Sequence, residues 1–120
     1  MTVLVARTTT PESAAAIQEA IAEAKRRSED LAIFDLDGEP AEGLISGELD
    51  GVQVSYHGND NRNRNAAAGL LDASVELGAS VLVIGVKHRS AVGKLLLGSN
   101  AQSIILDAQI PVLAVKAPQD

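Results

Sequence analysis

The segment from Val81 to Lys116 has the sequence VLVIGVKHRSAVGKLLLGSNAQSIILDAQIPVLAVK, and it decides the fold that we expect. Val81 to Ile84 is an uninterrupted apolar run that stops at Gly85, which is typical of a strand buried on both faces of a parallel sheet. Pro111 ends a helical pattern, and Val112 to Val115 forms a second apolar run. The segment therefore predicts a strand, a polar and basic loop, a helix and another strand.

A glycine precedes the predicted helix of this segment. Gly98 is followed by Ser99 and Asn100, either of which can cap a helix from Ala101 to Ala108. A glycine without a Cβ lets a ligand approach the backbone, and the free N–H groups of a first helical turn attract anions. A simple turn with a helix cap would have the same pattern. Both interpretations stay open on these residues alone.

The rest of the chain alternates strands and helices. Thr10 and Pro11 suit the cap and first position of one helix, and Asn65 caps a second helix that Gly78 closes. The predicted strands are Val3 to Ala6, Leu31 to Leu36, Val52 to Tyr56, Val81 to Ile84 and Val112 to Val115, and the predicted helices are Pro11 to Arg27, Ala66 to Leu77 and Ala101 to Ala108. This order predicts an α/β fold of three layers, in which a five-stranded, mostly parallel sheet carries helices on both faces.

The link between the second and third predicted strands departs from this alternation. Asp37 to Gly51, DGEPAEGLISGELDG, is rich in glycine and lacks helical periodicity. We expect a shortened crossover with at most one helical turn near Glu42 to Ile45, or a hairpin-like link.

Size and composition limit the class of protein. The chain has 120 residues, 46% of them hydrophobic, which suits one compact domain over residues 1–120. Its net charge of -6 disfavours nucleic acid as a partner. The absence of cysteine and the presence of two histidines argue against a metal site. No apolar run suits a membrane span and no signal peptide is recognisable, so we expect a cytoplasmic protein.

Most basic residues of the segment from Val81 to Lys116 lie in its predicted loop. Lys87, His88, Arg89 and Lys94 lie within eight residues of sequence. A cluster of this size fits one small anion better than a nucleic-acid duplex.

The order of elements and the loop spacing resemble the universal stress protein family over nearly the whole chain. In that family the fourth strand is followed by the pattern G-x2-G-x9-G-[ST], which cradles the ribose and phosphates of ATP in nucleotide-binding members. This chain has Gly85, two residues, His88, nine residues and then Gly98-Ser99, so the spacing is kept and one glycine is replaced. The resemblance implies ATP or AMP as a ligand, with Mg²⁺ only alongside the nucleotide.

The first loop is the family's other ligand contact, where an aspartate followed by glycine and serine holds the adenine. Here Ala6, Arg7 and Thr8 occupy the matching place, Thr9 replaces the glycine, and Leu36 aligns beside the base. A threonine hydroxyl can bond an adenine edge but supplies no charge. At position 88 the histidine side chain has three possible roles: blocking the pocket, donating to phosphate or remaining solvated. These departures weigh against a high-affinity ATP site of the usual kind.

The candidate ligand-binding residues come from both loops and the second strand, and none is assigned to catalysis. They are Ala6, Arg7, Thr8, Leu36, Gly85, Lys87, His88, Lys94, Gly98, Ser99 and Asn100. Two classes of function follow. The first is a non-enzymatic stress-response module that binds an adenine nucleotide or another phosphate-bearing ligand. The second is a ligand-free scaffold acting through a protein partner; the family resemblance implies a homodimer that pairs its last strands, Val112 to Val115.

A third hypothesis comes from Asp35-Leu36-Asp37-Gly38, which resembles the D-x-D-G motif of haloacid dehalogenase-like phosphatases. That chemistry needs two carboxylates, a metal, a lysine and further acidic ligands around one phosphate. Glu39 replaces the usual threonine after the motif, and no downstream acidic pair is recognisable. A strand end followed by an Asp-Gly turn explains the motif better.

Overall fold

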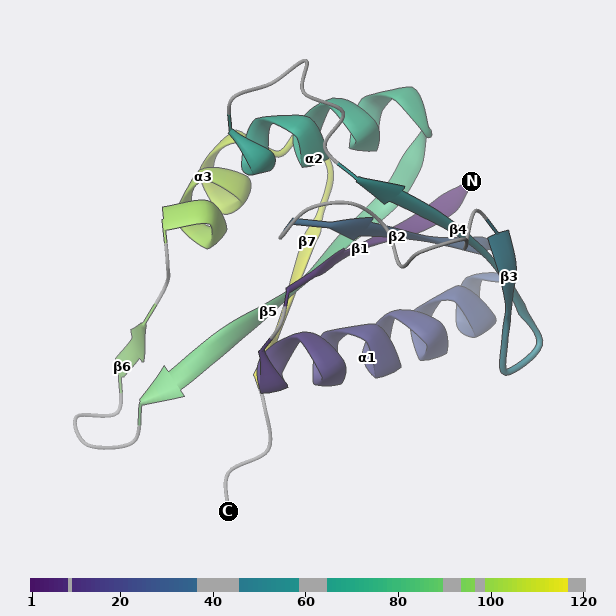
Figure 1. The fold of residues 1–120 in the computed structure, drawn as a ribbon, viewed down its shortest axis with the longest axis horizontal. Coiled ribbons are helices and arrows are strands. Elements are labelled where there is room, and N and C mark those ends of the chain that lie inside the picture. Colours follow the sequence, from purple (N-terminus) through teal and green to yellow (C-terminus); the bar gives the residue numbers. More distant parts are fainter. Residues whose placement is uncertain (9, 37–45, 59–64, 90–93, 97–98, 117–120) are drawn as a thin grey trace.

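A computed structural model describes residues 1–8, 10–36, 46–58, 65–89, 94–96 and 99–116 (Figure 1). In chain order its elements are β1 Thr2–Arg7, α1 Pro11–Arg27, β2 Asp30–Asp35, β3 Ser46–Leu49, β4 Val52–Gly58, α2 Ala66–Glu76, β5 Ala79–Arg89, β6 Lys94–Leu96, α3 Ser99–Asp107 and β7 Val112–Lys116. The five predicted strands correspond to β1, β2, β4, β5 and β7, and the three predicted helices are all present. The expected α/β fold is confirmed.

The sheet is doubly wound around β1. The strand order is β3-β4-β2-β1-β5-β6. In addition, β7 pairs with β5. The strands β1, β2, β4, β5 and β7 pair in parallel, whereas β3 is antiparallel to β4 and β6 is antiparallel to the end of β5. The strand order reverses on the two sides of β1, which creates a crevice at the carboxyl ends of the strands.

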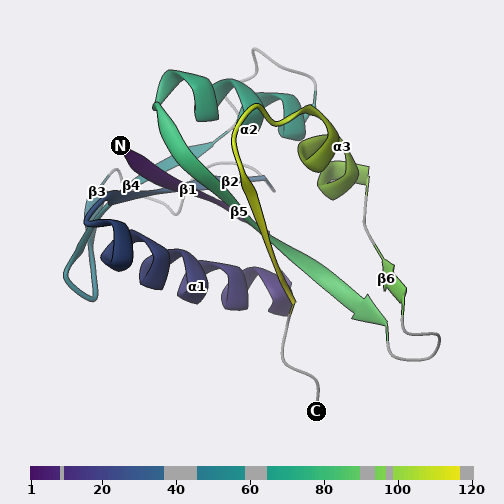
Figure 2. The same cartoon turned by 180° about the vertical axis from the view of Figure 1, so that it is seen from behind.

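Helices cover both faces of the sheet. Figures 1 and 2 show α1 on one side, with α2 and α3 together on the other. Alternate residues of β1 face the two layers: Val3 and Val5 pack with α1, whereas Leu4 and Ala6 pack in the cluster that includes α2 and α3. Strands that bury both faces need the continuous apolar runs seen in the sequence.

The ends of α1 form as the sequence predicts. Thr10 has extended backbone geometry and accepts a hydrogen bond from the Ser13 N–H, while Pro11 takes the first helical position. The helix ends at Ser28, whose φ of 54° and ψ of 46° are left-handed and whose N–H bonds the carbonyls of Ala24 and Lys25.

Two parts of the sequence prediction need correction. The fourth strand does not stop at Gly85, because β5 continues to Arg89 by pairing with β6 in the register Lys87 to Leu96 and Arg89 to Lys94. The segment that the sequence predicts to be a loop is therefore partly a two-stranded ribbon, and Figure 1 shows it extending beyond the rest of the sheet. The sheet gains β3 and β6, so it has two more strands than the five predicted.

The link before β4 ends in a β-hairpin. Leu49 pairs with Val52 across Asp50 and Gly51, whose φ values are 52° and 83°. Positive φ at both central residues is the geometry of a tight two-residue hairpin turn. The two strands that the link joins, β2 and β4, are parallel, so the link is the expected crossover, and the hairpin joins β4 to the additional strand β3. The helical turn proposed near Glu42 to Ile45 lies outside the described residues.

Candidate functional site

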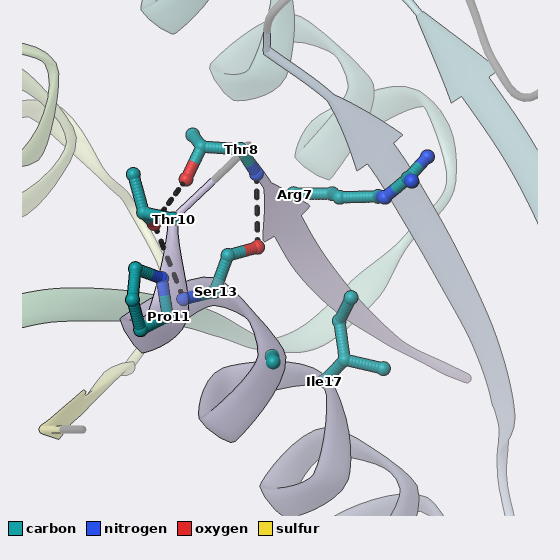
Figure 3. Close-up of a pocket in the computed structure, with 7 residues that line it drawn as sticks. Arg7, Thr8, Thr10, Pro11, Ser13 and Ile17 are labelled. Atoms are coloured by element: carbon teal, nitrogen blue, oxygen red, sulfur yellow. Dashed lines mark hydrogen bonds between the residues drawn. The ribbon is translucent and has the colours of Figure 1, made fainter. Parts of the chain in front are cut away.

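A cavity of about 370 Å³ lies where β1 ends and α1 begins. It opens at the carboxyl edge of the sheet, where doubly wound folds hold their ligands. Seven described residues line it: Arg7, Thr8, Thr10, Pro11, Ser13, Ala14 and Ile17. Figure 3 shows hydroxyl groups gathered on one side and the Arg7 side chain extending away on the other. The lining therefore offers hydroxyl groups, an apolar helix flank and one cation.

Hydrogen bonds fix the loop that forms the hydroxyl side of the cavity. The Thr8 N–H donates to Ser13 Oγ at 2.9 Å, and the Thr8 and Thr10 hydroxyl oxygens are 2.7 Å apart. The Ser13 N–H in turn reaches the Thr10 carbonyl at 3.1 Å and the Thr10 Oγ1 at 3.3 Å. Ser13 is 3% exposed, so it holds the loop from beneath the surface. Ser13 is absent from the predicted site residues, although its place three residues after the cap was a usable signal.

Arg7 and Asp35 form an ion pair at the ends of β1 and β2. They are cross-strand partners in the parallel ladder, and Arg7 Nη1 donates to Asp35 Oδ2 at 3.3 Å. The Leu36 N–H donates to the Arg7 carbonyl at 2.9 Å, which continues the ladder past the pair. The Arg7 side chain is 42% exposed and that of Asp35 is 14% exposed. The one charged residue among the described cavity lining is therefore already facing a carboxylate.

Gly85 lies against the first turn of α1. A Cβ at this position would be 2.4 Å from the Glu12 carbonyl oxygen and 3.0 Å from the Ser13 nitrogen. The distance to the Glu12 oxygen is shorter than real Cβ contacts, so any side chain would force the helix away from β5. Close packing of strand and helix gives this glycine a role that needs no ligand.

The structure brings together only part of the predicted ligand-binding set. Arg7 and Thr8 line the cavity. Ala6 is buried and Leu36 is partly buried in the core cluster on the opposite face of the sheet from α1. The remaining residues belong to other elements: Gly85, Lys87 and His88 to β5, Lys94 to β6, and Ser99 and Asn100 to the start of α3, while Gly98 lies outside the described residues. The sequence predicts Lys87, His88 and Lys94 in a loop, and they instead lie on paired strands.

Other polar groups do not assemble a second reactive centre in the described part of the chain. His57 Nε2 is 2.7 Å from Ser55 Oγ on β4, and burial lowers the pKa of His57 below its ordinary value. Neither residue is among those described as lining the cavity. Asp35, the first carboxylate of the D-x-D-G motif, pairs with Arg7, and Asp37 lies outside the described residues.

Metal-binding clusters and membrane-spanning helices are both missing from the described residues. No group of three or more His, Asp or Glu residues there could hold a metal ion. Within the same residues, no helix is both long and apolar enough to cross a membrane.

The sheet order and the cavity define a doubly wound α/β domain with its ligand edge at the end of β1. Residues 59–116 match the model of the universal stress protein family. A universal stress protein of Mycolicibacterium smegmatis is 38% identical in an alignment of length 117 that covers 88% of this chain and 90% of that relative. The chain belongs to the universal stress protein family.

Solved structures agree with this fold. One is the universal stress protein from Archaeoglobus fulgidus in complex with dAMP, which is 20% identical, has a TM-score of 0.65, and is matched over 97% of this chain and 98% of that one. Another is a universal stress protein in complex with cAMP, which is 17% identical, has a TM-score of 0.69, and is matched over 98% of each chain. At these identities the likeness concerns the fold.

Proposed function

We propose that this protein is a stress-response protein that binds an adenine nucleotide without catalysing a strong reaction. The observation that carries the proposal is the cavity of about 370 Å³ at the end of β1, with Arg7 and Thr8 in its lining. A cavity of this size falls within the range of small-molecule sites. Two proteins of the same fold whose structures contain dAMP and cAMP support an adenine ligand.

The proposed contacts divide between the two loops. Thr8 offers a hydroxyl to the adenine or ribose, and Arg7 is the nearby cation. Gly98, Ser99 and Asn100 would receive the phosphate at the start of α3, with Lys87, His88 and Lys94 preceding them in sequence. Mg²⁺ would enter only with a bound nucleotide that carries several phosphates.

Calorimetry and thermal shift with ATP, AMP and cAMP test this function. A ligand present at 100 times its Kd stabilises the folded state by about 2.7 kcal/mol, so specific binding raises the Tm. Thr8→Val removes the hydroxyl that is proposed to contact the ligand, at nearly constant volume, and should weaken binding. Thr2→Val makes the same change at the opposite end of β1 and should not. Absence of any shift at millimolar nucleotide would refute nucleotide binding.

As the second candidate function, we propose a scaffold that acts through a protein partner. In this proposal the protein is a homodimer that pairs through β7. Among the described strands β7 pairs only with β5, and Ala114 is exposed on it. The Leu82 N–H bonds the Pro111 carbonyl, so the alternation of a parallel ladder turns the Ala114 N–H away from β5. An unpaired edge of this kind favours pairing with another chain.

Light scattering after size exclusion tests the dimer. Ala114→Pro removes an outward N–H and should give a monomer, because proline cannot donate to a new ladder. Ala108→Ser, on the segment before β7, is the control and should leave the mass unchanged. A wild-type protein that is monomeric at all concentrations would exclude this arrangement.

A further inference from the structure

Arg7 and Asp35 set the charge at the β1 end of the proposed ligand site. Arg7 is the single charged residue among the seven described residues that line the cavity. Its guanidinium donates to Asp35 at 3.3 Å, and Figure 3 shows its side chain extending away from the hydroxyl groups of Thr8 and Thr10. The cation is therefore turned toward β2 and away from the hydroxyl side of the cavity.

Backbone hydrogen bonding fixes the Asp35 backbone beside Arg7. Asp35 is the last residue of β2 and pairs with Arg7 in the strand register, and the Leu36 N–H holds the Arg7 carbonyl at 2.9 Å. The Asp35 side chain is only 14% exposed, whereas that of Arg7 is 42% exposed. When an anionic ligand recruits the more exposed guanidinium, the fixed carboxylate stays beside it. A further negative charge that the ligand places near Arg7 is then repelled by Asp35.

We propose that Asp35 is a charge-selectivity residue that biases this site toward adenine ligands carrying no more than one phosphate charge. The inference rests on the proposed adenine-binding function and concerns a residue that the cavity lining does not include. Asp35 acts on the ligand through Arg7 and through its own negative field, so it determines specificity without touching the adenine. Adenosine and cAMP should therefore bind at least as well as ATP, although ATP has more groups to contact.

The test compares Asp35→Asn with Asp30→Asn. Both variants remove one negative charge from β2, but Asp30 is exposed at the far end of the strand. Calorimetry at low salt measures adenosine, cAMP, AMP and ATP with each protein. Asp35→Asn should raise ATP affinity relative to adenosine by about two- to fivefold, which corresponds to one exposed ion pair. Asp30→Asn should leave the ratio unchanged, and added salt should reduce the gain.

Inorganic phosphate provides a second measurement that needs no adenine site. The Arg7 side-chain N–H signals in NMR should respond to phosphate at lower concentrations in Asp35→Asn than in the wild type, with circular dichroism confirming that the variant is folded. An unchanged Arg7 response, a wild type that prefers ATP over adenosine tenfold, or equal effects of the two Asn variants would overturn charge selection. If no adenine compound binds the wild type, the proposed function fails, and the phosphate titration still decides whether Asp35 restrains Arg7.

Discussion

Replacing Gly85 by alanine should destabilise the protein even when no ligand is present. The new Cβ would lie 2.4 Å from the Glu12 oxygen and 2.6 Å from the Glu12 carbonyl carbon, whereas ordinary contacts begin near 3.4 Å. The obstacle is backbone, so no side chain can rotate out of the way. The first turn of α1 would have to retreat from β5 by roughly 1 Å, which is the difference between these distances.

Two opposing terms set the size of the effect. Alanine is favoured over glycine inside a strand by about 0.5–1 kcal/mol, because glycine loses more backbone entropy on folding. Overpacking a tight contact costs about 1–3 kcal/mol. Thr10 and Ser13 hold the first turn of α1 through hydrogen bonds, so it cannot relax freely. We therefore expect a net loss of about 1–2 kcal/mol in the free energy of unfolding, or about 4–8 °C in Tm.

Urea unfolding followed by circular dichroism measures this loss, with Gly47→Ala as the control. Gly47 also lies in a strand, but the atom nearest to a Cβ at that position is Tyr56 Cε2 at 4.0 Å. Gly47→Ala should be neutral or slightly stabilising. If Gly85→Ala matches this control in ligand-free protein, the close approach of α1 is wrong. A loss seen only in nucleotide binding would instead return Gly85 to the role of a ligand contact.

Three other predictions concern helix ends and pH. Asn65→Ala should cost about 1 kcal/mol in urea unfolding, because Asn65 Oδ1 accepts the Ala67 N–H at 2.8 Å; equal stability would argue against this cap. Ser28→Gly should stabilise by roughly 1 kcal/mol because it relieves a left-handed φ of 54°, and a lower Tm would contradict that geometry. Burial lowers the folded-state pKa of His57, so the unfolded state binds more protons and stability should fall below about pH 6.5. Part of that slope should disappear in His57→Gln, and an identical pH profile would exclude His57 as its source.

Local signals predicted most of the fold. Thr10 with Pro11 and Asn65 are side-chain caps within a few residues of the N–H groups they serve, so the helix starts were predictable. The Asp50-Gly51 dipeptide carried the hairpin signal as well, although the glycine-rich link obscured it. The predicted end of the fourth strand was wrong because the sequence pattern indicates Gly85 as the residue that terminates it. Its true constraint is the distant backbone of Glu12, and strand pairing with Leu95 and Leu96 continues beyond it.

The candidate site was only partly predictable for a related reason. Arg7 and Thr8 were predicted because the family resemblance places a ligand contact at the end of the first strand, and both residues line the cavity. Ser13 and Asp35 were not placed with them, because their contacts depend on how α1 folds back and on which strand lies next to β1. In the sequence Asp35 belongs to a phosphatase-like motif, whereas its described partner is the cation of a neighbouring strand.

The contact between Gly85 and Glu12 also weakens the glycine spacing from Gly85 to Gly98-Ser99 as an argument for nucleotide binding. A glycine at this position is required by the approach of α1 to β5, so it would be retained by a protein of this fold that binds nothing. Spacing from Gly85 to Gly98-Ser99 therefore supports the family and the fold more strongly than it supports nucleotide binding. Evidence for a ligand must come from residues that packing does not require. Arg7 is such a residue, since it is 42% exposed and lines the cavity, and its restraint by Asp35 makes charge preference the sharper measure of function.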